Sequence, residues 1–243
     1  MLVGHYAAAL VAKAVEPRAP FWVLVAGAQL VDIGWAGLVM AGVEKIRIDP
    51  SLPGSSLDLY YMPFTHSLPG ALAWGIAAML LCRLAISSSW RVCGIVGAVV
   101  FSHWLLDFLV HRPDLELWFG GAKVGLGVWN FPVQEAMLEM GLIALTGAAW
   151  LWERGRSQRP AWPALLFLLL LATLQIVASL TEPAGSTFAL GRTALVLYLV
   201  VSGLAALIDM KDRPAGPSSL PDQGEPVVLA DDLEPEIGRD FKF

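Results

Sequence analysis

The sequence predicts an all-α fold, a polytopic transmembrane bundle of six to seven helices followed by a disordered C-terminal tail. Hydrophobic residues make up 56% of the 243 residues, charged residues only 15%, and the mean hydropathy is +0.63. A soluble domain of average composition carries about 25% charged residues. Several apolar runs of about 20 residues are also long enough to cross the hydrocarbon core of a bilayer. The chain is therefore expected to be an integral membrane protein, with the lipid bilayer as its first partner.

The apolar runs divide the chain into helices and loops. Residues 2–15 would form a helix of roughly 21 Å, shorter than a bilayer core of about 30 Å, so we expect a tilted incomplete span or a helix packed within the bundle. Polar loops rich in proline or glycine are expected at 44–64 and 111–130. Full spans are expected over 21–43, 66–86, 92–110, 131–152, 162–180 and 193–209.

The last part of the chain differs from the rest. Residues 211–243 contain several prolines and a late acidic cluster, and such a segment cannot bury enough apolar surface to offset its ordering entropy. We therefore divide the chain into a transmembrane helical domain, 1–210, and a disordered acidic cytoplasmic tail, 211–243. The tail has no long basic patch, which argues against direct binding of nucleic acid and leaves a protein partner open.

Loop charges predict the orientation in the membrane. Cytoplasmic loops of membrane proteins carry an excess of lysine and arginine. If the loop between 152 and 162 is cytoplasmic, most cations of the chain fall on that side, which places the N-terminus outside and the tail inside. The cytoplasmic set is then Lys13, Arg18, Arg83, Arg91, Arg154, Arg156, Arg159, Lys211 and Arg213.

The stretch of residues 102–114 carries the most unusual polar residues. His103, Asp107 and His111 are spaced four residues apart, so they lie along one face of a helix. Ionisable groups inside an apolar span are costly unless they have partners or a function. Neutral imidazole and carboxylate are also common metal ligands. With the predicted topology, His5 and His66 lie in the same outer half of the bundle, so that all four histidines of the chain gather there.

This gathering predicts a metal site, with the ligands His5, Asp32, His66, His103 and Asp107. Nitrogen and carboxylate oxygen donors suit zinc, the favoured ion, and also manganese or iron. Five ligands exceed what one tetrahedral zinc needs, so the set leaves room for a second metal or for carboxylates that orient the imidazoles.

Three further polar residues are secondary candidates, namely Asp58, His111 and Glu139. We assign catalytic roles to Glu139 and Asp58. Glu139 is the candidate general base, because a carboxylate in an apolar wall is more basic than one in water.

Each candidate also has a purely structural interpretation. A single Asp in a span, such as Asp32, can simply hydrogen-bond a neighbouring helix. His5 can be an ordinary interface residue, and His111 can mark a polar helix end before Pro113. His103 and Asp107 can also form a hydrogen-bonded pair that satisfies itself.

Four short motifs resemble those of a known family, namely Gly4-His5-Tyr6, Leu30-Val31-Asp32-Ile33, Phe64-Thr65-His66-Ser67-Leu68 and Ser102-His103-Trp104-Leu105-Leu106-Asp107. The resemblance is to the bacterial membrane-bound metal-dependent hydrolases, also described as LexA-binding, inner-membrane-associated hydrolases, and it covers residues 1–150. It is closest to a branch whose members are often labelled permeases, and it implies metal positions at the five ligands named above. The family's Pro-Asp-x-Asp motif is Val31-Asp32-Ile33-Gly34 here, without the second carboxylate.

Residues and resemblance together lead us to expect a metal-dependent hydrolase in a bacterial inner membrane. The metal would activate water for attack on a phosphoester or a related ester of a small-molecule or lipid-derived substrate near the membrane. The alternative is a transporter or permease in which the same His/Asp cluster binds a cation or protons. A scaffold whose tail recruits a partner is the third possibility.

Overall fold

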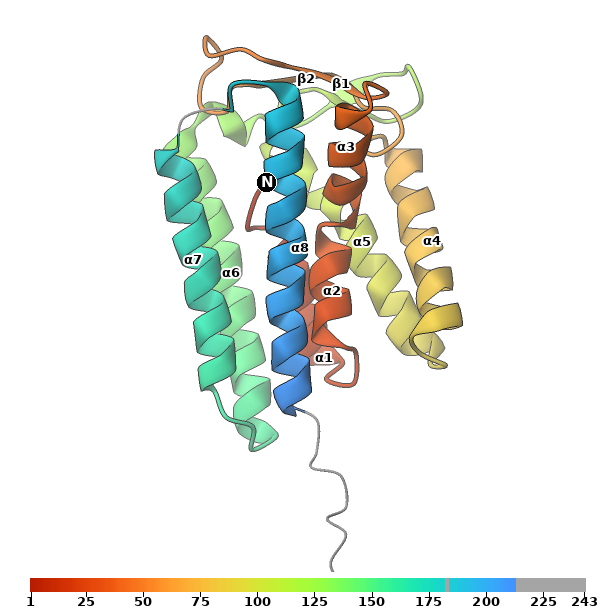
Figure 1. Ribbon diagram of the computed structural model, residues 1–243, viewed down its shortest axis with the longest axis vertical. Coiled ribbons are helices and arrows are strands. Elements are labelled where there is room, and N and C mark those ends of the chain that lie inside the picture. Colours follow the sequence, from red (N-terminus) through yellow and green to blue (C-terminus); the bar gives the residue numbers. More distant parts are fainter. Residues whose placement is uncertain (182–183, 213–243) are drawn as a thin grey trace, which may run out of the picture. The chain divides into compact units, whose positions relative to one another are not determined.

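The computed structural model describes residues 1–181 and 184–212, and these form a helical bundle (Figure 1). The predicted disordered tail lies outside the described residues, apart from Lys211 and Asp212, which end the last helix. The helices are α1 (Tyr6–Val15), α2 (Phe21–Ala28), α3 (Leu30–Met40), α4 (Leu68–Ala85), α5 (Trp90–Val110), the 3-10 turn η1 (Val128–Asn130), α6 (Pro132–Arg156), α7 (Trp162–Leu180) and α8 (Thr187–Asp212).

Within the described residues, four helices are long and apolar enough to cross a membrane, namely α4, α5, α7 and α8. The pair α2 and α3 qualifies as a fifth span if its two halves are counted together. The prediction of a membrane protein is therefore confirmed by four to five candidate spans. Helix α6, 25 residues long, runs beside α7 (Figure 1) but is not among these candidate spans.

Two of the predicted helices differ from their expected form. Residues 2–15 were expected to form either a tilted incomplete span or a helix packed within the bundle. Helix α1 is packed within the bundle, and its Ala9 and Leu10 are fully buried. The span expected over 21–43 is broken at Gln29, where α2 and α3 meet at an angle of 48°. The Ala28 carbonyl at the end of α2 is therefore free for a donor outside the helix.

The loops expected at 44–64 and 111–130 contain short antiparallel hairpins. Strand β1 (Lys45–Ile48) pairs with β2 (Leu57–Tyr61), and β3 (Leu115–Glu116) pairs with β4 (Lys123–Val124). Both loops lie over the same end of the bundle, at the top of Figure 1. Arg112 joins them, because its guanidinium donates to Leu57 O at 3.1 Å and to Asn130 Oδ1 at 2.8 Å.

The opposite end of the bundle carries the turns between α1 and α2, α4 and α5, and α6 and α7, together with the end of α8 (Figure 1). The buried Arg154 forms two hydrogen bonds with Asp212, at 2.6 and 3.0 Å. Lys13 Nζ lies 3.5 Å from Asp209 Oδ1. These ion pairs fasten the end of α8 to α6 and α1.

Helices α4 and α5 pack closely at a pair of glycines. A Cβ atom on Gly97 would lie 2.8 Å from the Gly75 carbonyl oxygen and 3.0 Å from Met79 Cβ. Small residues at helix crossings allow the backbones of transmembrane helices to approach each other. The packing of α4 against α5, which carries His103 and Asp107, therefore depends on this contact.

We expect Gly97→Ala to lower the free energy of unfolding by about 1–3 kcal/mol, the usual cost of overpacking a close contact. Thermal unfolding of the purified protein in detergent would measure the effect. Gly94→Ala on the same helix is the matched control, because a Cβ there meets nothing within 4 Å. Equal melting temperatures for the two variants would contradict the proposed close packing.

Candidate metal centre

The structure brings the five predicted ligands together from four segments of the chain. His5 caps α1, Asp32 lies in the first turn of α3, His66 precedes α4, and His103 and Asp107 lie on α5. All five side chains are buried, Asp32 being the most accessible with 8% of its surface exposed. The convergence expected from topology is thus observed, and these buried groups could hold a metal ion.

One side of the cluster contains two carboxylates and two imidazoles. His66 Nε2 lies 3.4 Å from Asp32 Oδ1 and 3.4 Å from Asp107 Oδ2. His103 Nε2 lies 3.4 Å from Asp32 Oδ1 and 3.2 Å from Asp107 Oδ2. Each imidazole nitrogen thus faces one oxygen of each carboxylate at nearly the same distance.

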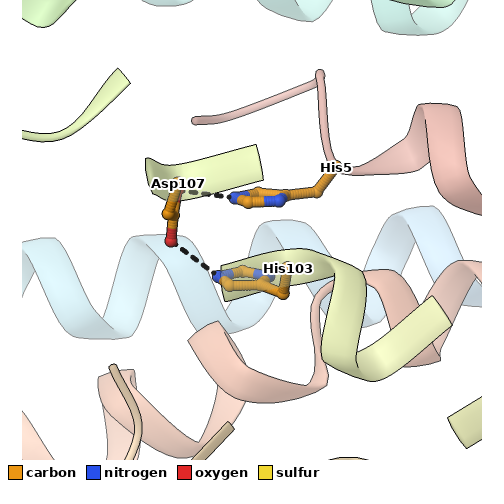
Figure 2. A group of neighbouring side chains, drawn as sticks. All are labelled: His5, His103 and Asp107. Atoms are coloured by element: carbon orange, nitrogen blue, oxygen red, sulfur yellow. Dashed lines mark ion pairs between the residues drawn. The ribbon is translucent and has the colours of Figure 1, made fainter. Parts of the chain in front are cut away.

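The other oxygen of Asp107 faces different groups. His5 Nε2 lies 3.1 Å and His111 Nε2 3.3 Å from Asp107 Oδ1, and the Met1 nitrogen donates to this oxygen at 2.9 Å. Figure 2 shows the rings of His5 and His103 lying parallel, each with a nitrogen directed at Asp107. Their centroids are 3.6 Å apart. Asp107 is therefore the residue that all four histidines share.

Hydrogen bonds at the outer side of two rings decide which nitrogen carries the proton. His103 Nδ1 lies 2.9 Å from Ala28 O, and a carbonyl only accepts, so Nδ1 is the protonated nitrogen. This carbonyl ends α2 and is freed by the break at Gln29. His66 Nδ1 lies 2.8 Å from Thr65 Oγ1, whose hydroxyl donates to Glu44 Oε2 at 2.6 Å.

In neutral rings, these bonds would leave the Nε2 lone pairs of His66 and His103 facing carboxylate oxygens. Among the described residues, His103 Nε2 and Asp107 Oδ2 are buried without a hydrogen-bond partner, and so are both ring nitrogens of His5. Lone pairs of nitrogen and oxygen that face each other repel, and a cation between them turns the repulsion into coordination. The donor set therefore fits a divalent metal.

Three residues that the sequence did not single out support these ligands. The Tyr198 hydroxyl of α8 donates to Asp32 Oδ2 at 3.0 Å, which leaves Oδ1 free to face the histidines. Glu44 accepts from the backbone nitrogen of Thr65 at 2.9 Å in addition to its hydroxyl. Thr65 stands next to a predicted ligand, but nothing in the apolar sequence around Tyr198 marks it as a partner of Asp32.

Glu139, the predicted general base, holds the segment that precedes α1. Its buried carboxylate accepts from the Leu2 nitrogen at 3.0 and 3.1 Å and from the Gly4 nitrogen at 2.7 Å. Gln29 also donates to the Leu2 carbonyl at 2.9 Å. These contacts fix the backbone just before His5, so Glu139 helps to position His5 in the cluster.

Asp58, the other predicted catalytic residue, lies on β2 and outside the cluster. Its half-exposed carboxylate is 3.7 Å from Arg47 Nη1 on the paired strand. This placement gives no support to a direct catalytic role for Asp58.

Comparison with known proteins was made at three levels. No family model, no curated protein and no solved structure matches the chain. The resemblance to membrane-bound hydrolases therefore stays a prediction, and the chemistry of the cluster is the basis for a function.

We expect Thr65→Val to weaken metal binding by about 10–100-fold, the usual effect of removing a group that orients a ligating histidine. Valine has nearly the shape of threonine but cannot accept the Nδ1 proton of His66. Isothermal titration of metal-depleted protein with Zn²⁺ would measure the change. Thr65→Ser keeps the hydroxyl and should bind Zn²⁺ like the parent. If Thr65→Val also binds Zn²⁺ with the parent's affinity, the hydrogen bonds through Thr65 to Glu44 do not support metal binding.

Proposed function

We propose that the protein is a membrane-embedded metal-dependent hydrolase that acts on a phosphoester or related ester at the membrane. One observation carries the proposal, namely the four nitrogen–oxygen separations of 3.2–3.4 Å around Asp32, His66, His103 and Asp107. A zinc ion with four tetrahedral ligands at 2.0–2.1 Å holds those atoms about 3.3–3.4 Å apart. The agreement favours zinc, with manganese or iron as alternatives.

The residues around the cluster supply what such a reaction needs. A bound divalent metal provides an acidified water as nucleophile and stabilises negative charge on the substrate oxygen. The hydrogen bonds from His66 Nδ1 to Thr65 and from Thr65 to Glu44 hold a proton on Nδ1 and so favour His66 Nε2 as the ligand atom. Glu139 lies beside the segment that carries His5, and a role as general base rests on its sequence position alone.

Location in the membrane completes the proposal. The cluster is buried between helices that can span a bilayer, which favours a lipid-derived or membrane-proximal substrate. We place the protein in a bacterial inner membrane, with α6 as a further span and six to seven membrane helices in all. The turns rich in arginine lie together at one end (Figure 1), which favours that end as cytoplasmic and the N-terminus as outside.

A transporter or permease is the second candidate. One observation favours it, because the broken pair α2 and α3 lies directly beside the cluster, and discontinuous helices often form the ion sites of transporters. Uptake of a cation into proteoliposomes, without hydrolysis of phosphoesters by the same preparation, would support this function over the hydrolase.

We expect the purified parent protein to contain zinc or another transition metal and to hydrolyse a phosphodiester such as bis-p-nitrophenyl phosphate. The double variant His103→Ala plus Asp107→Ala should lose both the metal and the activity. Mass spectrometry of metal content and release of p-nitrophenol would provide the two measurements.

Asp49→Asn is the matched control, because Asp49 is an exposed carboxylate that only bonds Ser51. This variant should keep the metal. Absence of any bound metal from the parent, even after incubation with Zn²⁺, would overturn the proposed function.

A further inference from the structure

We infer that the cluster binds two divalent cations bridged by the carboxylate of Asp107, and that His111 is a ligand of the second cation. The inference rests on the proposed metal binding and extends it. It assigns His111, which sequence reasoning ranked behind the five predicted ligands, to the site itself. It also divides the ligands into two groups.

The division follows from the two oxygens of Asp107. Oδ2 faces His66 and His103, whose nitrogens also face Asp32. Oδ1 faces His5 and His111 at 3.1 and 3.3 Å. The His111 distance matches the separation of about 3.3–3.4 Å between ligands of one tetrahedral zinc, and the His5 distance is slightly shorter. A carboxylate that bridges two cations presents one oxygen to each, and such pairs of metals lie about 3.5–4 Å apart.

His111 has the surroundings of a metal ligand rather than of a polar helix end. A residue that only marks a helix end is usually exposed, whereas His111 is 2% exposed although it directly follows α5. Its Nδ1 bonds Asp114 Oδ1 at 2.9 Å, and its ring stacks on Trp129 with centroids 4.0 Å apart. A carboxylate on the far nitrogen is the typical partner of a histidine that binds metal through the other nitrogen.

A different positive group competes for the second position. The Met1 nitrogen lies 2.9 Å from Asp107 Oδ1, on the same oxygen that His5 and His111 face. If this ammonium group keeps its place, Asp107 bridges one metal and one amine. The two arrangements differ in the number of metal ions per chain, and a titration separates them.

The second cation would differ from the first in its chemistry. The first position has four protein ligands and would take water or substrate only as a fifth ligand, whereas His5, His111 and Asp107 give the second three. Catalytic zinc sites use three protein ligands and keep the fourth position for water or substrate. The two carboxylates also leave two divalent cations with net positive charge, which suits an anionic phosphoester.

The test is a Mn²⁺ titration of metal-depleted full-length protein in detergent, followed by electron paramagnetic resonance. The parent should bind two Mn²⁺ per chain and show the broadened spectrum of two exchange-coupled ions. His111→Gln should bind one Mn²⁺ and show the six-line spectrum of an isolated ion. The same stoichiometries are expected for Zn²⁺ by mass spectrometry.

Two further variants make the result decisive. Asp49→Asn should keep two ions, and its melting temperature provides the reference for correct folding. If His111→Gln does not fold, Asp114→Asn replaces it: this variant keeps the ligand but should weaken the second cation about 10–100-fold relative to the first.

Each outcome has a distinct meaning. One ion in the parent, unaffected by His111→Gln, would overturn the two-metal inference and leave the proposed hydrolase standing. Two ions in both the parent and the variant would remove His111 from the site. No binding of Mn²⁺ or Zn²⁺ by the parent would overturn both this inference and the proposed function.

Discussion

The buried carboxylate of Asp107 is the constraint on which the rest of the site depends. Both its oxygens lie close to imidazole nitrogens, and the residue is 1% exposed. An isolated charge in such a position is strongly unfavourable, so the surrounding chain must supply positive charge or a cation. Four segments each bring an imidazole nitrogen toward it, from His5 before α1, His66 before α4, His103 on α5 and His111 after α5.

The sequence predicted much of this arrangement. The four-residue spacing of His103, Asp107 and His111 sets one helix face, and the order of apolar runs places His5 and His66 at the same depth. The gathering of the four histidines could therefore be expected from topology, because it follows from the order of the spans and the periodicity of a helix. The division between His5 and His111 on one side and His66 and His103 on the other could not, since it depends on which oxygen of Asp107 each ring faces.

Other features were hidden because they arise from tertiary contacts. Tyr198 lies in the apolar run of residues 194–201, and only the packing of α8 against α3 brings its hydroxyl to Asp32. The hairpins over the site were expected as plain loops, because short strands of two to five residues leave little periodicity to detect. Glu139 was predicted to act as general base, which stays a prediction, and its hydrogen bonds to the backbone before α1 could not be foreseen from sequence.

The bend at Gln29 connects the site to the lipid bilayer around the protein. The break leaves the Ala28 carbonyl free to accept from His103 Nδ1. The orientation of the His103 ring is therefore tied to the angle between α2 and α3. Bent and tilted helices are the elements that adjust when the thickness of a bilayer changes. A membrane that straightened this pair of helices would move the Ala28 carbonyl, and Asp32 in the first turn of α3, relative to the His103 ring.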